Sequence, residues 1–343
     1  DGSIDPSDAP VSTLDNVTYT LTDNITSSGD GIIVERDNII IDGDGCMLQG
    51  SGMSKGFVLS GINNVTVRRT SIQRFGSGIY FDGSSNITLS FNTIVSNYGS
   101  GIYISNSVNN SIFDNTISKN DEQATVWLLS SSNNSIYRNN ITENGAGGIG
   151  LYESSLNNLY ENNIANNVMW GIDLRLASFN IIIGNNITNN RYGLSLWGEN
   201  NVLKNNSMVG NSYNFGGSYG SVQDIDSSNT VNGKSIYYWV NRQNMEVPSD
   251  AGYVALINSN NITVEGLKLE NNDPCVLLAF TTKSQITNNI IKNSTIGIAL
   301  FSSSNNSLSN NVIEYAGYGI NLQNSSYNTL SSNNVANADS AGI

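Results

Sequence analysis

The chain has 343 residues, a net charge of −13 and no histidine. Its 15 basic residues form no cluster, which argues against binding to nucleic acid or to an anionic membrane surface. No apolar run in the sequence is long enough for a membrane-spanning helix.

A glycine followed by an aliphatic residue recurs along most of the chain. Neighbouring pairs lie 22 or 23 residues apart, and one step of 47 residues spans two repeats. The pairs begin at Gly78, Gly101, Gly148, Gly171, Gly193, Gly297, Gly319 and Gly342. A fixed period of this length indicates a solenoid. Within one repeat the apolar residues alternate in short runs, as at Ile79 and Phe81, which is the spacing of strands rather than helices.

Three short strands with their turns account for one repeat. The sequence therefore predicts an all-β fold, a single-stranded, right-handed parallel β-helix with three-strand coils of about 22–23 residues. Successive coils are expected to stack about 4.8 Å apart. A leucine-rich repeat has a similar period, but its leucine frame is missing, and a propeller blade needs about twice this length.

The period also divides the chain. Residues 1–30 are irregular and are expected to cap the open end of the solenoid. Residues 31–212 and 256–343 carry the repeat, and residues 213–255 interrupt it as a β-rich insert. Because the chain stops at 343, just as a new coil begins, we expect the C-terminal end to be truncated.

Asparagine recurs at matching places in the coils. The first series is Asn64, Asn86, Asn110, Asn134, Asn158, Asn180 and Asn201. The second is Asn92, Asn115, Asn139, Asn162, Asn185 and Asn205, and the third is Asn97, Asn120, Asn144, Asn167, Asn190 and Asn211. Asparagine suits sharp corners, and stacked amides bond one another, so a structural role is predicted.

The repeat resembles that of a known family. The stretch Ser132–Leu151, SNNSIYRNNITENGAGGIGL, resembles the parallel β-helix repeats of NosD-like proteins and of carbohydrate-binding and sugar-hydrolysing β-helix proteins. The stretch Asn229–Asn261, which begins NTVNGKSIYYWVN, resembles an insert of NosD-like archaeal surface proteins. The resemblance implies export to the cell surface or a periplasm-like space and, through the insert alone, an archaeal origin. It specifies fold much more than function.

Catalytic motifs of sugar-processing β-helices are missing. The Asp-Pro-His signature of mannuronan epimerases is absent, because Cys275 follows Asp273 and Pro274, and so is the Gly-His-Gly of polygalacturonases. We therefore assign no catalytic residue, no metal ligand and no cofactor. A copper site has only methionines and the two distant cysteines, Cys46 and Cys275, to draw on. These cysteines are expected to be buried, inert thiols.

One column of residues is a candidate contact face. Because Ile79 and its equivalents are expected to point inward, their neighbours should point outward. The outward residues that could contact a glycan are Tyr80, Tyr103, Trp127, Tyr152, Asp173, Arg175 and Trp197. Aromatic faces suit sugar C–H surfaces, and a carboxylate and a guanidinium suit hydroxyls. The alternative interpretation is an aromatic ladder that only stabilises the sheet.

Glycosylation motifs are frequent, but no more so than the asparagine, serine and threonine content gives by chance. Candidate sites are Asn86, Asn109, Asn133, Asn186 and Asn261.

Three functional classes remain open. The favoured one is an exported cell-surface protein with a structural or adhesive role that contacts glycans and associates with itself end to end or laterally. The second is a polysaccharide lyase, epimerase or hydrolase. The third is a NosD-like accessory protein in metal-centre maturation.

Overall fold

The computed structural model describes residues 2–121, 124–217 and 219–343. Every regular element in these residues is a β-strand, and no helix there is long and apolar enough to cross a membrane. The chain forms two compact units, residues 1–181 and 182–343, which are described separately.

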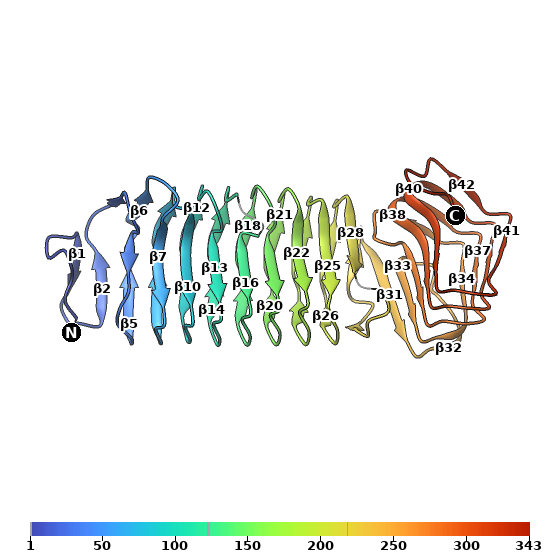
Figure 1. Ribbon diagram of the computed structural model, residues 1–343, viewed down its shortest axis with the longest axis horizontal. Helices are drawn as coiled ribbons and strands as arrows, with labels where there is room; N and C mark the ends of the chain where they lie inside the picture. The colour runs from blue at the N-terminus through green and yellow to red at the C-terminus, as the bar shows by residue number, and fades with distance from the viewer. Residues whose placement is uncertain (1, 122–123, 218) are drawn as a thin grey trace. The chain divides into compact units, whose positions relative to one another are not determined.

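The first unit is a stack of coils whose strands form three parallel rows, seen as successive rungs in the blue to green part of Figure 1. Row A contains β2 (Thr18–Leu21), β5 (Ile39–Asp42), β8 (Val65–Arg68), β11 (Thr88–Ser90), β14 (Ser111–Phe113), β17 (Ser135–Tyr137) and β20 (Asn158–Tyr160). Row B contains β3 (Ile25–Ser27), β6 (Met47–Gly50), β9 (Ser71–Gln73), β12 (Thr93–Val95), β15 (Thr116–Ser118), β18 (Asn140–Thr142) and β21 (Asn163–Ala165). Row C contains β4 (Ile32–Ile33), β7 (Lys55–Ser60), β10 (Ser77–Asp82), β13 (Ile102–Ser105), β16 (Val126–Leu129), β19 (Ile149–Tyr152) and β22 (Trp170–Arg175). At the N-terminal end β1 (Val11–Thr13) pairs antiparallel with β2.

The predicted fold class is confirmed by the register of the coils. Ile79 pairs with Ile102, Ile102 with Val126, and Ile149 with Ile172, so partners lie 23 or 24 residues apart. These side chains are at most 1% exposed and form a shared interior row. Each buried isoleucine contributes roughly 1.5–3 kcal/mol of hydrophobic free energy, which makes the interior row a main source of stability.

The recurring glycine has a steric cause. A Cβ on Gly78 would lie 2.7 Å from the carbonyl oxygen of Gly101 and 2.7 Å from Cγ2 of Ile94. Neighbouring coils approach too closely at this point for any side chain, so the repeat requires glycine where row C begins.

Buried asparagines form ladders in which each side-chain amide donates to the side-chain oxygen of the next coil. Asn92 donates to Asn115 (3.1 Å), Asn115 to Asn139 (3.0 Å) and Asn139 to Asn162 (3.1 Å). The other ladders of this unit join Asn97, Asn120, Asn144 and Asn167, and Asn110, Asn134, Asn157 and Asn180. The predicted structural role is therefore confirmed for most members.

The structure divides the asparagine series between buried ladder positions and exposed corners. Asn157, the neighbour of Asn158, belongs to the buried ladder, and Asn206, the neighbour of Asn205, is buried as well. Asn64 and Asn86 lie at exposed corners with left-handed backbone (φ 57° and 56°). Adjacent asparagines leave the inward-facing one ambiguous, because the sequence period alone does not fix which of the two turns in.

The second unit begins with short parallel strands like those of the first unit and then changes. Its first strands are β24 (Asn186–Thr188), β25 (Tyr192–Trp197), β26 (Val202–Lys204), β27 (Ser207–Val209), β28 (Tyr213–Gly217), β29 (Asp224–Ile225) and β30 (Thr230–Val231), while β23 (Ile181–Ile183) spans the limit between the units. β31 (Lys234–Val240) pairs antiparallel with β30 and parallel with β33 (Ala251–Ile257). The stretch 213–255 is thus built of strands, and the predicted limits of the four segments stay predictions.

The later coils of the second unit pack around a new core that includes Val254, Leu278, Ile298 and Ile320. One set of strands is β35 (Lys268–Glu270), β36 (Val276–Ala279), β38 (Ile290–Phe301), β40 (Val312–Gln323) and β42 (Asn334–Ala336). A second sheet contains β32 (Gln243–Glu246), β34 (Asn260–Glu265), β37 (Gln285–Thr287), β39 (Ser307–Ser309) and β41 (Thr329–Ser331), in the yellow to red part of Figure 1.

Candidate functional site

The outer face of row C in the first unit gathers most of the predicted contact residues. Tyr80 pairs in register with Tyr103, and Tyr103 with Trp127. Tyr152 pairs with Arg175, and Asp173 lies two residues before Arg175 on the same strand. We call the set Tyr80, Tyr103, Trp127, Tyr152, Asp173 and Arg175 the aromatic strip. The parallel register therefore brings six of the seven predicted residues onto one face.

The tyrosines at one end of the strip stack on each other. The ring centres of Tyr80 and Tyr103 are 5.4 Å apart with planes 8° apart, and Lys55 Nζ lies 3.6 Å from the Tyr80 ring centre. Burial and the nearby Asp82 carboxylate raise the pKa of Tyr80, so its phenol remains a hydrogen-bond donor. Stacking covers one face of each ring, and the Lys55 ammonium group lies over the ring of Tyr80.

Trp127 lies where the neighbouring coil has no side chain. Its partner in β19 is Gly150, and a Cβ there would lie 2.5 Å from Trp127 Cε3. Tyr152, on the same coil as Gly150, has its ring centre 6.4 Å from that of Trp127, with the ring planes 20° apart. The half-buried indole thus lies against Gly150 and Tyr152 of the next coil, and its N–H group can donate to an acceptor.

Asp173 differs from the expectation of an exposed carboxylate, because it is only 4% exposed. Arg175 Nε donates to Asp173 Oδ2 at 2.7 Å, and Arg175 Cζ lies 4.9 Å from the Trp170 ring centre. The guanidinium, which stacks on Trp170 and is itself partly exposed, covers the carboxylate. Arg175 is thus the charged group that this end of the strip offers to solvent.

Trp197, the seventh predicted residue, belongs to the second unit. It is 46% exposed, and its Nε1 donates to Ser195 Oγ at 2.8 Å. Its ring meets that of Tyr219 edge-on, with centres 6.5 Å apart.

All five glycosylation candidates have exposed side chains. Asn86, Asn109 and Asn133 lie at left-handed corners of the first unit, and Asn186 and Asn261 lie in the second.

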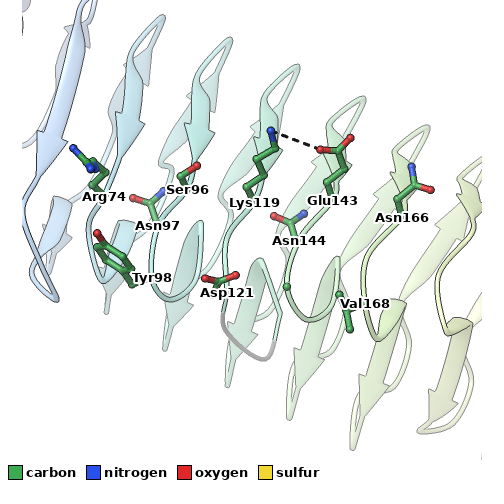
Figure 2. A pocket seen from close by; sticks show the side chains of 11 residues that line it. Arg74, Ser96, Asn97, Tyr98, Lys119, Asp121, Glu143, Asn144, Asn166 and Val168 are labelled. Atoms are coloured by element: carbon green, nitrogen blue, oxygen red, sulfur yellow. Dashed lines mark ion pairs between the residues drawn. The ribbon is translucent and has the colours of Figure 1, made fainter.

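The first unit also contains a groove that the sequence did not predict. It follows the corners where the chain leaves row B and enters row C, and its volume is about 600 Å³ (Figure 2). One edge is formed by Arg74, Ser96, Lys119, Glu143 and Asn166, and the last four of these directly precede members of the third asparagine series. The only signal for it in the sequence was that polar spacing, which has no apolar period to mark it. We call it the corner groove.

The second unit holds a largely buried acid, Asp273, in the Asp-Pro-Cys stretch that lacks the histidine of the epimerase signature. Asp273 accepts a hydrogen bond from the Thr295 hydroxyl, and burial raises the pKa of Asp273 against the opposing effect of its bonds from Thr295 and Tyr219. Burial also raises the pKa of the Cys275 thiol to about 12 and that of Tyr253 well above its usual value. Cys275 and Tyr253 are therefore protonated at neutral pH, and of the three groups only Asp273 is partly exposed.

The fold and the strip define a parallel β-helix protein with an aromatic outer face. Residues 38–238 and 223–343 match the family described as periplasmic copper-binding protein (NosD), so the chain belongs to the NosD family. No curated protein matches it.

Several solved structures are similar to the chain in fold. The A-module of mannuronan C-5 epimerase AlgE6 from Azotobacter vinelandii is 14% identical, with a TM-score of 0.44 over 95% of this chain and 89% of that one. DFA-IIIase from Arthrobacter chlorophenolicus A6 is 13% identical, with a TM-score of 0.44 over 82% and 67%. PfbA, a surface adhesin of Streptococcus pneumoniae, is 12% identical, with a TM-score of 0.43 over 87% and 81%. At these values the likenesses carry no inference about function.

The residues present do not fit the copper of the family description. The sequence offers no histidine, two cysteines and five methionines. Cys46 is half-buried rather than buried as expected, Cys275 is buried with a protonated thiol, and both are free. Within the described ranges no three Cys, Asp or Glu side chains gather as metal ligands. Copper(I) prefers thiolate and thioether sulfur, and copper(II) prefers imidazole, whereas this chain has no histidine and only two cysteines, both free.

Proposed function

We propose that this chain is an exported β-helix protein of the cell surface or of a periplasm-like space, with a structural or adhesive role, that contacts glycans through the aromatic strip. The single observation that carries the proposal is the alignment of Tyr80, Tyr103 and Trp127 in register on one outer face. Membership of a family described as periplasmic supports the location.

The chemistry of the strip suits sugars in a specific way. The indole N–H of Trp127 and the phenol of Tyr80 donate to sugar hydroxyl oxygens, and the Arg175 guanidinium, stacked on Trp170, does the same. Because Tyr80 and Tyr103 each cover one face of the other and Lys55 lies over the Tyr80 ring, we take the indole as the main ring surface for sugar C–H groups. A strip of this kind supports weak, repeated contacts, which fits adhesion better than turnover.

A glycan array probed with the full chain tests the proposal. Trp127→Ala is expected to reduce binding about tenfold, which corresponds to about 1.4 kcal/mol. Tyr137→Ala is the matched control, because Tyr137 stacks between Phe113 and Tyr160 on the outer side of row A. Equal binding by the wild type and Trp127→Ala, or equal losses in both variants, would remove the strip from the proposal.

The enzyme class needs a different readout. Asp173 is held by Arg175, so the strip has no free acid and base pair of the kind that glycoside hydrolysis uses. Release of products from uronate polymers by the purified chain would favour a lyase, epimerase or hydrolase instead.

Glycan attachment and self-association stay proposals of the same kind. Mass spectrometry of the protein purified from its native host tests attachment at Asn86, Asn109, Asn133, Asn186 and Asn261. Analytical ultracentrifugation over a range of concentrations tests end-to-end or lateral association.

A further inference from the structure

The corner groove is a separate concave surface in the first unit. Its volume of about 600 Å³ falls within the range of about 300–1,000 Å³ typical of ligand pockets. Figure 2 shows its side chains arriving from the corners of successive coils. The groove therefore runs along the coil axis and is built by repetition.

The outer edge of the groove is a regular row. Arg74, Ser96, Lys119, Glu143 and Asn166 all have left-handed backbone, with φ between 55° and 60°. Backbone bonds join the corners, since Arg74 N donates to Ser96 O at 3.1 Å and Glu143 N donates to Ala165 O at 3.1 Å. The row therefore presents one polar side chain per coil at the strand spacing of about 4.8 Å.

The floor of the groove is fixed by a buried ladder. Asn97 donates to Asn120 at 2.9 Å, and Asn144 donates to Asn167 at 2.8 Å. Their backbone N–H groups also bond the next coil, as Asn97 N does to Asn120 Oδ1 at 3.1 Å. A ligand in the groove thus meets a surface that is already ordered, which lowers the entropic cost of binding.

The charges in the groove are mixed. Lys119 Nζ and Glu143 Oε2 are 3.9 Å apart, and the two side chains are 62% and 60% exposed, so their ion pair is weak and easily exchanged for ligand contacts. Arg74 and Asp121 make no ion pair or side-chain hydrogen bond within the described part of the chain. A polyanion in the groove is repelled by Asp121 and Glu143, and a polycation is repelled by Arg74 and Lys119.

An uncharged, hydroxyl-rich chain can form hydrogen bonds with both the acidic and the basic side chains of the groove. Sugar hydroxyls donate to the carboxylates of Asp121 and Glu143 and accept from Arg74. Tyr98, which is 50% exposed and lines the groove, offers a ring face to sugar C–H groups. The coil spacing is close to the length of one sugar residue in an extended chain.

We propose that the corner groove binds a linear, neutral polysaccharide that lies along the coil axis with about one sugar per coil. The inference rests on the proposed glycan role, but it uses a surface distinct from the aromatic strip. Such a groove selects extended polymers that lie in one orientation, whereas the contacts of the strip alone do not depend on the orientation of the polymer.

Isothermal titration of the full chain tests this inference with cello-oligosaccharides and manno-oligosaccharides of increasing length, from the disaccharide upward. Affinity is expected to rise with each added sugar and to level off once the groove is filled. Tyr98→Ala and the nearly isosteric Asp121→Asn are each expected to weaken binding of the longest oligomer about tenfold, while Tyr137→Ala leaves it unchanged. Circular dichroism shows that each variant is folded.

The outcomes separate the two proposals. Binding that is lost in Trp127→Ala but retained in Tyr98→Ala and Asp121→Asn supports the strip and overturns the groove. Binding lost in the groove variants and retained in Trp127→Ala supports the groove and removes the strip. Affinity independent of oligomer length, preference for uronate or amino-sugar polymers, or no binding of any neutral oligomer overturns the groove inference, whatever the array shows for the strip.

Discussion

The indole of Trp127 fills the space where a side chain on Gly150 would lie. A Cβ at residue 150 would come within 2.5 Å of Trp127 Cε3, 2.6 Å of its Cζ3 and 2.9 Å of Ala124 Cβ. The glycine of one coil thus sets the position of the ring of the preceding coil, and the orientation of the strip depends on a residue that contributes no side chain to it.

Gly150→Ala is therefore expected to displace the indole. Overpacking of this kind costs about 1–3 kcal/mol, and glycan binding should fall to the level of Trp127→Ala. Near-UV circular dichroism and the denaturation midpoint measure the two effects. Gly52→Ala is the control, because a Cβ there meets nothing within 4 Å. Unchanged aromatic circular dichroism in Gly150→Ala would contradict this account of the ring's position.

Removal of one ladder amide should destabilise the protein strongly. Asn139→Ala deletes the oxygen that accepts from both the backbone and side-chain N–H of Asn115, at 3.1 and 3.0 Å, and also the donor to Ile112 O. Buried groups left without partners cost about 1–3 kcal/mol each, so we expect a loss of about 3 kcal/mol by chemical denaturation.

The neighbouring Asn140 provides the control for this variant. Its side chain is exposed and accepts from Asn163 Nδ2 at 2.7 Å. Asn140→Ala should change the free energy of unfolding by less than about 0.5 kcal/mol. Similar losses in both variants would show that the buried position adds nothing.

Asp42 is expected to make the protein sensitive to acid. Its burial opposes ionisation, but hydrogen bonds from Arg69, Asp44 N–H and Arg68 outweigh that effect and lower its pKa. A carboxyl whose pKa is lowered by folding stabilises the folded state above its ordinary value of about 3.9, and this contribution is lost as the pH falls through the lower, folded value. Asp42→Asn should cost about 1–3 kcal/mol at neutral pH and flatten the decline of stability below about pH 4.

Asp114→Asn is the comparison for Asp42. Its partner Arg138 lies 2.8 Å away, but the Asp114 side chain is 24% exposed, against 4% for Asp42. Its loss should cost no more than about 1 kcal/mol and should shrink in high salt. A pH profile identical in the wild type and Asp42→Asn would refute the assignment.

Asp273 is expected to change the stability with pH in the opposite direction to Asp42. Burial raises its pKa, so its contribution favours the folded state at pH values below about 4 and is lost as the pH rises through the raised, folded value. Asp273→Asn keeps an acceptor for Thr295 and removes the buried charge. The variant is expected to be more stable than the wild type at neutral pH and to show no gain at acid pH. Equal melting temperatures across the whole pH range would count against a buried, ionisable Asp273.

Copper binding should be weak in spite of the family's description. Since no histidine is present and the Cys275 thiol is buried and protonated, titration with copper(I) or copper(II) is expected to show no tight site. Sub-micromolar binding that disappears in Cys46→Ser would reverse this expectation and favour a role in metal-centre maturation.

The parts of the structure that were predictable follow the period of the sequence. Ile79, Ile102 and Ile172 were placed in one inner row because apolar residues one coil apart must share the core. The strip followed by alternation from the same row. Neither step requires knowledge of the corners, where polar side chains have no apolar partner to orient them.

What escaped prediction lies at positions that the period does not constrain. The burial of Asp173 depends on Trp170, a residue outside the repeating column, and on how Arg175 folds back over the carboxylate. The corner groove depends on polar residues whose spacing was visible but whose common face was not. The archaeal origin taken from the insert stays a prediction.

The asparagine ladders of the first unit also act as a ruler for the chain. The side-chain amides donate their hydrogen bonds in the same direction along the stack, from Asn92 to Asn115 and onward to Asn162. If the segment between two equivalent asparagines is deleted, a ladder amide again faces the side-chain oxygen of an asparagine in the next coil. A deletion of any other length places a different residue opposite that amide and breaks the ladder. Natural variation in the length of this unit should therefore come in whole turns.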